Sequence, residues 1–366
     1  MQKPIVIYTG SDFHLFHPKT PTKKICDEIR KYILSIEDAD IFIIAGDFFD
    51  RLSTIPKEES AEAEIIIYEI LKWAKEKDVL VRVLEGTPSH DWKQSRWFTR
   101  INTLSGIHAD VGYFDTLDIE YIKRYDLQVL YIPDEWDEPD NTLDQVKRLM
   151  ISKGLEQVDI AVMHGQFHYQ LPHVARAPKH NEEEYLKLVK YFITIGHVHK
   201  HTTLDRIFAQ GSFSRLAHGE EEPKGFYRFV IHPDGQMESN FIENKDALLY
   251  ITIDITDLSV EESYRYIEER LQSIPEMQHV RIQAYSDHPV LKNIDTLIKR
   301  YPLYRWSSKI EKRKEEILER EEIVFQEYQP LVIHENNIKD LLRDRLINKG
   351  IDSKMIEDAL LLIEGG

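Results

Sequence analysis

The feature that most constrains the fold is an alternation of short apolar runs and helical patterns over the first two hundred residues. The apolar runs are rich in β-branched residues and cover six segments, 4–9, 40–45, 79–84, 127–132, 159–163 and 191–195. Such runs are typical of strands that are buried on both faces. Helical patterns over 22–35 and 60–77 lie between them. Because strands that alternate with helices need crossover connections, with helices covering both faces of the sheet, we predict an α/β fold.

The rest of the chain predicts further parts. Short strands over 206–244, with a turn signal at His232-Pro233-Asp234-Gly235, predict a hairpin that ends a first domain at about residue 245. A strand, a helix and a strand over 248–255, 260–274 and 279–285 predict a small α/β capping domain that ends at 306. The segment 307–366 predicts a charged linker helix and a helical tail, with short amphipathic helices over 337–348 and 352–363.

Composition excludes several classes of protein. The formal charge is −17, from 47 Lys+Arg and 64 Asp+Glu, so the overall field does not favour nucleic acid, although local patches and metals can. The single cysteine, Cys26, excludes an intramolecular disulfide framework and a multi-cysteine zinc site. No apolar run approaches the length of a bilayer span, and the start lacks a secretory signal pattern. We therefore expect a soluble, cytoplasmic protein with no membrane partner.

Five groups of acidic residues and histidines follow predicted strands. They are Asp12 with His14, Asp47, His90 with Asp91, His164, and His197 with His199. The carboxyl ends of strands are where open α/β sheets gather their ligands. Imidazole and carboxylate together suit manganese, iron or zinc, and a shared carboxylate can bridge two cations. Any one of these residues could be structural, but the repetition at successive strand ends predicts a site for two divalent metal ions, with Mn²⁺ the expected metal.

These groups resemble the motifs of the calcineurin-like metallophosphoesterases, which read D-x-H, G-D-x-x-D-R, G-N-H-D/E, H and G-H-x-H. The corresponding segments are Asp12-Phe13-His14, Gly46-Asp47-Phe48-Phe49-Asp50-Arg51, Gly86-Thr87-Pro88-Ser89-His90-Asp91, His164-Gly165 and Gly196-His197-Val198-His199. The resemblance covers about the first 240 residues. It implies a two-sheet sandwich flanked by helices, with the metals at the strand ends.

The resemblance also implies a role for each residue. Asp12, His14 and His199 would hold one metal, His164 and His197 would hold the other, and Asp47 would bridge them. Two cations about 3.5–4 Å apart can clamp a phosphate and activate a water for in-line attack. As catalytic residues, His90 would donate a proton to the phosphate or leaving oxygen, and Asp50 would orient His90 or support Arg51.

One motif departs from the family pattern. The family's asparagine ligand should directly precede the histidine, but Ser89 stands there, after Pro88. Either Ser89 coordinates the second metal, or Thr87, a backbone carbonyl or a water replaces the amide oxygen. Because a serine hydroxyl is a weaker and shorter ligand than an amide, we expect weaker occupancy of that metal.

The order of the three parts resembles the exonuclease subunit of the SbcCD type and its phage counterparts. The resemblance is also carried by Gly211-Ser212-Phe213-Ser214-Arg215, Lys224-Gly225-Phe226 and Val280-Arg281-Ile282. It implies a DNA exonuclease or endonuclease of repair or recombination, whose second domain caps the active site and touches DNA. It further implies that the C-terminal helices dock on the coiled coil of an SMC-like ATPase. A homodimer is also compatible with this resemblance.

Two segments mix basic and aromatic residues in this acidic chain. The segment 92–100 contains Lys93, Arg96 and Arg100, and the segment 292–306 contains Lys299, Arg300 and Arg305 among Tyr301, Tyr304 and Trp306. Such mixtures can hold phosphates and stack on frayed bases. The alternative is that both are ordinary amphipathic segments whose aromatic residues belong to the core.

Two other functions remain open from the sequence. A phosphatase or phosphodiesterase for a small molecule or phosphoprotein would predict no DNA binding and a dispensable tail. A non-catalytic phosphoesterase-like scaffold is favoured by the departure at Ser89. It is opposed by Asp47 and by the intact histidines, which a scaffold does not need.

Overall fold

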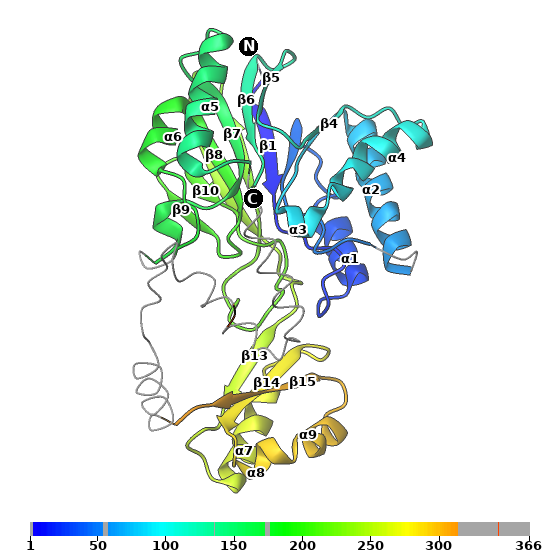
Figure 1. Cartoon of the computed structure of the whole chain (residues 1–366). Coiled ribbons are helices and arrows are strands. Elements are labelled where there is room, and N and C mark those ends of the chain that lie inside the picture. Colours follow the sequence, from blue (N-terminus) through cyan, green and yellow to red (C-terminus); the bar gives the residue numbers. More distant parts are fainter. Residues whose placement is uncertain (1–2, 54–57, 135, 173–175, 314–342, 344–366) are drawn as a thin grey trace. The chain divides into compact units, whose positions relative to one another are not determined.

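The computed structural model of the chain describes residues 3–53, 58–134, 136–172, 176–313 and 343 (Figure 1). The chain divides into two compact units, 1–309 and 310–366. Except for Arg343, the tail helices expected over 337–348 and 352–363 lie outside the described residues. Within the described ranges, no helix is long and apolar enough to cross a lipid bilayer.

The first sheet has six strands in the order β12-β11-β1-β2-β3-β4. Their bounds are Ile5–Gly10 for β1, Ile41–Ala45 for β2, Leu80–Leu84 for β3, Val111–Phe114 for β4, Gly225–Ile231 for β11 and Met237–Glu243 for β12. Strands β1 to β4 are parallel, and β11 is antiparallel to β1. The predicted hairpin is confirmed, since β11 pairs with β12 and Gly235 in its turn has a φ of +85°.

The second sheet also has six strands, in the order β5-β6-β7-β8-β10-β9. Their bounds are Asp118–Ile122 for β5, Leu127–Ile132 for β6, Val158–Gly165 for β7, Val189–His197 for β8, Thr202–Leu204 for β9 and Ile207–Ala209 for β10. Strands β6, β7, β8 and β10 are parallel. The carboxyl ends of these neighbouring strands therefore lie at one edge of the sheet.

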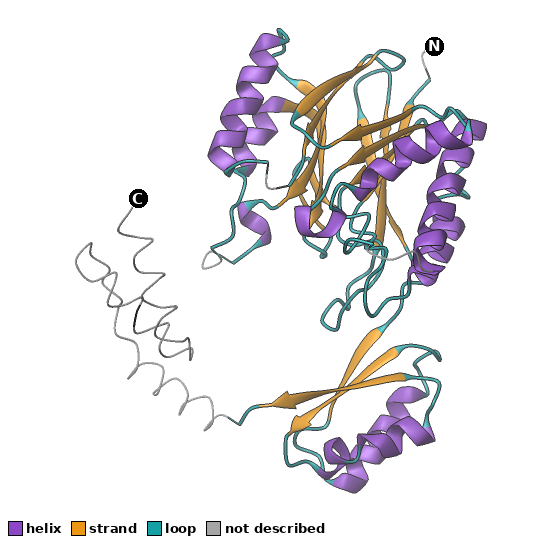
Figure 2. Cartoon of the chain, turned by 45° about the vertical axis from the view of Figure 1, so that its right-hand side comes forward, coloured by secondary structure: helices purple, strands orange, loops and turns teal. Residues whose placement is uncertain are grey.

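Three apolar layers hold the two sheets and their helices together. Figure 2 shows the sheets and the helices that flank them. One layer lies between the sheets and includes Ile43, Val129 and Phe229. On its outer face the first sheet packs against α1 (Thr22–Tyr32), α2 (Glu58–Lys77) and α4 (Trp97–Ser105). The second sheet packs against α5 (Pro139–Ser152) and α6 (Glu182–Leu188). The predicted α/β two-sheet sandwich flanked by helices is confirmed.

A separate three-stranded sheet follows, in the order β13-β14-β15, with its own apolar cluster. Its strands are β13 (Tyr250–Asp254), β14 (His279–Tyr285) and β15 (Arg305–Glu311), and its helices are α7 (Val260–Leu271), α8 (Pro289–Lys292) and α9 (Ile294–Arg300). Helix α7 begins with a capping box between Ser259 and Glu262. The expected strand–helix–strand order is confirmed, and β15 runs past residue 306, where the domain was expected to end.

Candidate metal centre

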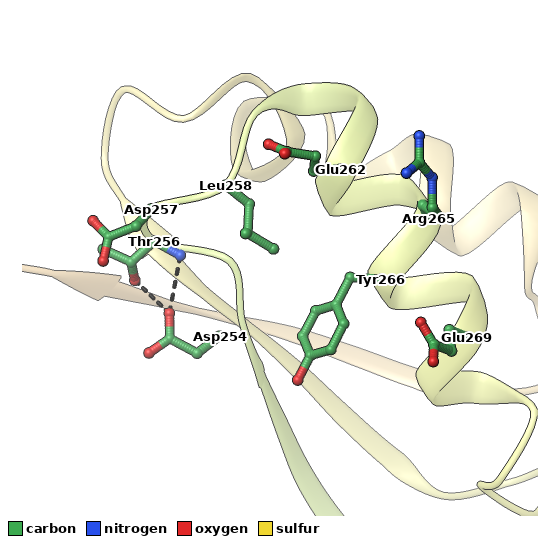
Figure 3. A pocket seen from close by; sticks show the side chains of 8 residues that line it. All are labelled: Asp254, Thr256, Asp257, Leu258, Glu262, Arg265, Tyr266 and Glu269. Atoms are coloured by element: carbon green, nitrogen blue, oxygen red, sulfur yellow. Dashed lines mark hydrogen bonds between the residues drawn. The ribbon is translucent and has the colours of Figure 1, made fainter.

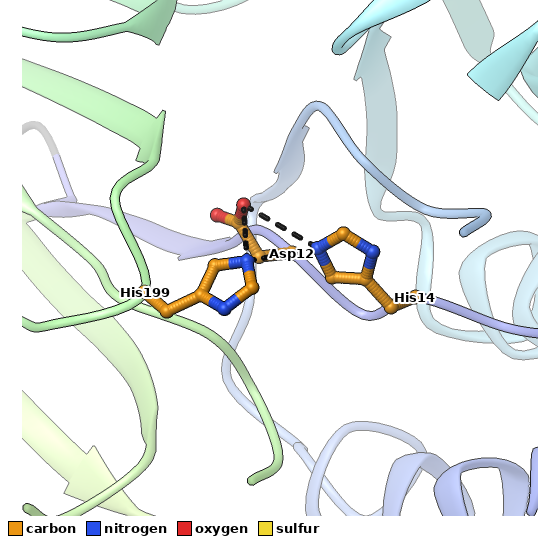
Figure 4. A group of neighbouring side chains, drawn as sticks. All are labelled: Asp12, His14 and His199. Atoms are coloured by element: carbon orange, nitrogen blue, oxygen red, sulfur yellow. Dashed lines mark hydrogen bonds and ion pairs between the residues drawn. The ribbon is translucent and has the colours of Figure 1, made fainter. Parts of the chain in front are cut away.

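Residues from both large sheets meet where their strands end. Asp12 and His14 follow β1, Asp47 follows β2, His164 lies near the end of β7, and His197 ends β8. Their ligand atoms form a first group, Asp12–His14–His199, and a second group, Asp47–His164–His197, and a third group, His14–Asp47–His90, overlaps both. Within each group the ligand atoms lie within 4.8 Å of one another. The structure therefore brings all seven of these predicted Asp and His residues together. Figure 4 shows the first group, with dashed lines from one Asp12 carboxylate oxygen to a ring nitrogen of His14 and a ring nitrogen of His199.

The backbone at the cluster adopts conformations that L-residues rarely take. The φ angles are +52° at Asp12, +53° at His14, +50° at Asp47 and +95° at His197. Non-glycine residues with a left-handed backbone cost free energy and concentrate at functional sites. Four of the predicted metal ligands share this property, which sets the direction of their side chains at the strand ends.

Two motif glycines let these loops approach one another. A Cβ at Gly46 would lie 2.2 Å from His164 Nδ1, and a Cβ at Gly86 would lie 2.1 Å from the backbone nitrogen of Asp47. Both distances are far below van der Waals contact, so any side chain at either position would push the cluster apart. The glycines of these motifs are therefore required for close packing of the loops.

The Asp12 carboxylate is the centre of the first group. Its Oδ1 lies 3.8 Å from the Nε2 atoms of both His14 and His199. Ser11 Oγ donates to Asp12 Oδ2 at 2.5 Å, and the His197 backbone N–H donates at 3.0 Å. Burial raises the pKa of Asp12, but the hydrogen bond with His14 and the nearby histidines outweigh it and lower the pKa to about 2. Asp12 is therefore ionised at neutral pH although it is buried.

Three histidines of the cluster are held through their Nδ1 atoms. Nδ1 of His14 lies 3.1 Å from Asp50 Oδ1, that of His199 lies 2.9 Å from Glu220 Oε1, and that of His164 lies 2.7 Å from the Ala45 carbonyl oxygen. Metal-binding histidines commonly have such a partner on the nitrogen that does not bind the metal. Asp50 thus contacts His14, whereas the motif resemblance assigned it to His90 or Arg51.

Glu220 and Lys224 support His199 and were not predicted as site residues from the sequence. Glu220 Oε2 accepts from the Leu216 backbone N–H at 3.1 Å and lies 3.2 Å from Lys224 Nζ. Lys224 is 1% exposed and donates to the His199 carbonyl at 2.8 Å. Burial raises the pKa of Glu220, but its contacts with His199 and Lys224 lower it to about 2. The only sequence signal for this support was the segment Lys224-Gly225-Phe226.

The Asp47 carboxylate joins the second group to the first. Its Oδ2 lies 3.3 Å from His164 Nε2 and 3.8 Å from His14 Nε2. Burial raises the pKa of Asp47, but the charge and hydrogen bond of His164, followed by His90, hold it well below its usual range. A buried carboxylate placed between two groups of histidines is the arrangement that a bridging ligand requires.

At the second group, Thr87 takes the place for which Ser89 was proposed. Thr87 Oγ1 lies 3.2 Å from Asp47 Oδ2, 3.4 Å from His164 Nε2 and 3.2 Å from His197 Nδ1. Residues 88–91 form the helical turn α3, and this turn leaves Ser89 exposed, with its carbonyl accepting from the Trp92 indole N–H at 2.7 Å. This backbone turn, which the motif spacing does not reveal, leaves Ser89 exposed and places Thr87 Oγ1 among the cluster residues.

His90 is half-buried at the edge of the cluster. Its Nδ1 lies 2.9 Å from Asp47 Oδ2, and its side chain is 37% exposed. The hydrogen bond with Asp47 raises the pKa of His90, while burial opposes the shift. The same contact also makes His90 a possible ligand beside His14 and Asp47. Arg51 is exposed, and its carbonyl accepts from Gln94 Nε2 at 3.0 Å.

Asp91, which the sequence places in one of the five strand-end groups without a role of its own, connects two of the site loops. Its Oδ1 accepts from the Phe49 backbone N–H at 2.9 Å, and its Oδ2 accepts from the Gly86 backbone N–H at 2.8 Å. It is fully buried, and burial raises its pKa to about 8. Asp91 therefore ties the loop after β2 to the loop after β3.

In the first basic–aromatic segment, part of the aromatic surface belongs to the core. Phe98 is fully buried and Trp97 packs against the same cluster. Lys93 Nζ and Arg96 Nη2 lie 3.3 and 2.6 Å from Asp115 Oδ2. Arg100 is exposed, and Trp92, beside His90, is 54% exposed.

In the second segment, the structure favours the core alternative for the aromatic residues. Tyr301, Tyr304 and Trp306 pack against the apolar cluster of the small sheet. Among the basic residues, Arg300 pairs with Glu268 at 3.2 Å, Arg305 donates to the Lys19 carbonyl at 3.1 Å, and Lys299 is exposed.

Two hollows differ in their relation to the metal centre. One, of about 460 Å³, borders the cluster and is lined by Asp134, Gly165, His180 and His197 among others. The other, of about 400 Å³, lies between the end of β13 and α7 (Figure 3). Its lining includes four carboxylates, Asp254, Asp257, Glu262 and Glu269. Because like charges repel, the second hollow does not suit a phosphate.

No protein-family model matches the chain. No curated protein matches it either. Among solved structures, TT1561 of Thermus thermophilus is 11% identical with a TM-score of 0.36, covering 65% of this chain and 99% of that one. Another crystal structure is 13% identical, with the same coverage and TM-score. These likenesses are too distant to bear on function.

The donor set fits divalent transition metals. It combines two buried carboxylates with five imidazoles, and both carboxylates lie within 4 Å of ring nitrogens. Nitrogen and oxygen donors of this kind suit manganese, iron and zinc. Buried carboxylates grouped in this way are also costly unless cations accompany them.

Proposed function

We propose that the protein is a hydrolase that cleaves phosphodiesters with two divalent metal ions, in the manner of the metallophosphoesterases that its motifs resemble. The observation that carries the proposal is the set of overlapping ligand groups, in which Asp47 belongs to two groups and His14 to two. The five motifs supply these residues in the family's order. A scaffold would have no reason to bury Asp12 and Asp47 among histidines at a strained strand edge.

The chain's residues divide into metal holders and a proton donor. Asp12, His14 and His199 would hold one ion, His164 and His197 would hold the other, and Asp47 would lie between them. When bound, two such ions neutralise a phosphodiester and activate a water. His90, half-exposed and hydrogen-bonded to Asp47, would donate a proton to the phosphate or to the leaving oxygen.

DNA is the substrate that we propose. The exposed Trp92 indole follows His90 by two residues in the sequence, and Lys93, Arg96 and Arg100 come after it. An exposed aromatic face and nearby cations can stack on a base and hold its phosphates. Together with the SbcCD-type order of parts, this supports an exonuclease or endonuclease of DNA repair or recombination. The alternative is a phosphodiesterase or phosphatase for a small molecule or phosphoprotein.

A substrate panel tests the proposal. Nicked, blunt and single-stranded DNA would be incubated with the full chain and Mn²⁺, beside a generic aryl phosphodiester. We expect cleavage of DNA that is lost with a chelator and lost in Asp47→Ala and His197→Ala at an unchanged circular dichroism spectrum. Cleavage of the aryl ester alone would favour the small-molecule alternative. A chain that binds no metal and cleaves nothing would favour the scaffold.

The proposed partner is an SMC-like ATPase that binds the C-terminal helices. This part of the proposal concerns residues outside the described ranges and stands on the sequence alone. Truncation after Glu322 should leave cleavage of short single-stranded DNA intact and abolish co-purification with the ATPase. It should also abolish ATP-stimulated cleavage of long duplexes. An undiminished complex in gel filtration would place the interface elsewhere.

A further inference from the structure

The second metal position lacks the asparagine of the family motif, and a threonine hydroxyl stands among its polar groups. Thr87 Oγ1 has four polar neighbours, Asp47 Oδ2 at 3.2 Å, His164 Nε2 at 3.4 Å, His197 Nδ1 at 3.2 Å and Asp134 Oδ2 at 3.1 Å. Thr87 is 8% exposed, and the Asp134 side chain is 12% exposed. Asp134 belongs to no family motif quoted above and was not predicted from the sequence.

The separations suit ligands that share one cation. Bonds of about 2.0–2.2 Å at right or tetrahedral angles place neighbouring donor atoms about 2.8–3.6 Å apart. Thr87 Oγ1 lies within that range of Asp47, His164 and His197, the three residues of the second group. The hydroxyl oxygen is therefore placed to join the coordination sphere of a cation that these three residues would hold.

The proton of that hydroxyl needs an acceptor, and Asp134 is placed to be it. A threonine hydroxyl has one proton to donate. Asp47 would offer its oxygens to the cations, which leaves Asp134 Oδ2, at 3.1 Å, as the remaining oxygen acceptor among the four neighbours. Donation to a carboxylate raises the electron density on the hydroxyl oxygen, as a carboxylate does for a metal-bound histidine.

The sheet explains why Asp134 is in place. Strands β6 and β7 are parallel, and Ile132 pairs with Met163. Asp134 follows β6 by two residues, so it lies beside the end of β7, where a Cβ at Gly165 would be 3.4 Å from Asp134 Oδ1. Neighbouring strands thus deliver Asp134 and His164 to the same point.

We propose that Thr87 Oγ1 is a ligand of the second metal and that Asp134 is a positioning residue acting through it, the pair replacing the family's amide. This inference rests on the proposed function, because it assumes that the cluster binds two metals. The competing explanation is a purely structural hydrogen bond, since the Thr87 backbone N–H also donates to Asp47 Oδ1 at 2.6 Å.

Metal binding by the full chain, without substrate, tests the inference. Calorimetric titration with Mn²⁺, and electron paramagnetic resonance of coupled Mn²⁺ pairs, would be compared among variants. Thr87→Val, which nearly keeps the shape of the side chain and removes its hydroxyl, should weaken the binding of the second Mn²⁺ by about 10–100-fold. Thr87→Ser, which keeps a hydroxyl, should retain the binding of the second Mn²⁺. Ser89→Ala is the matched control and should bind Mn²⁺ with wild-type affinity. Thermal unfolding in a chelator would show that each variant is folded.

A double-mutant cycle tests the role of Asp134. In the wild-type background, Asp134→Asn should weaken the binding of the second Mn²⁺. In a chain that already carries Thr87→Val, it should have little further effect. Equal losses in both backgrounds would overturn the role through Thr87. Two Mn²⁺ ions bound by Thr87→Val with wild-type affinity would overturn the whole inference and leave the proposed function standing. A wild-type chain that binds no Mn²⁺ would instead refute the proposed function.

Discussion

The strand-end cluster and the segment 92–100 were both predicted as functional, yet they are built in opposite ways. In the cluster, Asp12 and Asp47 are buried, and each contacts several histidines from different strands. In the segment, Lys93 and Arg96 are largely exposed, and both pair with Asp115. The cluster is fixed by tertiary structure, whereas the segment's positive charge is partly neutralised on the surface.

The energies involved explain the difference. A buried carboxylate without partners costs several kcal/mol, so its surroundings must supply compensating groups. A surface ion pair is worth about 0–1 kcal/mol and forms with whatever carboxylate is near. Strand-end spacing therefore predicts well which Asp and His side chains come together, because burial allows few alternatives. A local excess of basic residues predicts less, since Asp115 lies 19 residues after Arg96 and outside the segment.

The largest effect on the cluster side of this comparison is expected for His90. His90→Asn should keep both metals and lower turnover by about two to four orders of magnitude, because a positioned proton donor contributes that much. Elemental analysis and single-turnover kinetics would measure the two properties. His108→Asn, at a loop position away from the cluster, is the control and should change neither. Loss of a metal in His90→Asn would make His90 a ligand.

Much of the fold and the cluster could be predicted because the controlling patterns are local. The apolar runs located β1, β2, β3, β6, β7 and β8, and the residues after them located the Asp and His groups. Strands β4 and β9, which the sequence did not predict, have only four and three residues, too few for a clear pattern. Glu220 and Asp134 could not be predicted, because their roles depend on tertiary contacts and no motif contains them.

The next effect concerns stability within the cluster. Asp91→Ala leaves the buried backbone N–H groups of Phe49 and Gly86 without their acceptor. Each unsatisfied group costs about 1–3 kcal/mol, so the free energy of unfolding should fall by about 2–6 kcal/mol. Urea denaturation of the metal-free chain measures it. An unchanged midpoint would show that Asp91 does not hold these loops together.

The same residue predicts a pH dependence. Burial raises the pKa of Asp91 from 3.8 to about 8, so the native state holds this proton where the unfolded chain releases it. The contribution of protonated Asp91 to the free energy of unfolding is complete below the pKa of Asp91 in the unfolded chain. It is lost as the pH rises through the pKa of Asp91 in the folded protein. Between about pH 4 and pH 8, the free energy of unfolding of the wild type should therefore fall relative to that of Asp91→Asn. A constant difference would contradict the shift.

A smaller effect is expected for Asp50, whose observed contact differs from the role expected from the sequence. Asp50→Ala removes the partner of His14 Nδ1, so Mn²⁺ affinity should fall by about 10–100-fold. Calorimetry would measure the affinity, and kinetics at saturating Mn²⁺ would measure turnover. Unchanged affinity with reduced turnover would show that Asp50 acts on His90, the role that the motif resemblance implied.

The smallest effects are expected on the surface side of the comparison. If Lys93 and Arg96 meet a phosphate, the DNA must replace their ion pairs with Asp115, so part of the gain is lost. Arg96→Gln should weaken the binding of single-stranded DNA by only about two- to fivefold, equally for all sequences. It should also reduce the slope of the logarithm of the binding constant against the logarithm of salt concentration by about one. Asp115→Asn should strengthen binding by a similar factor, because it frees both cations. Lys123→Gln, in the turn between β5 and β6 and therefore at the amino end of β6, is the matched control in fluorescence anisotropy. A loss of DNA binding by two or more orders of magnitude in Arg96→Gln would show that Arg96 contacts the DNA without competition from Asp115.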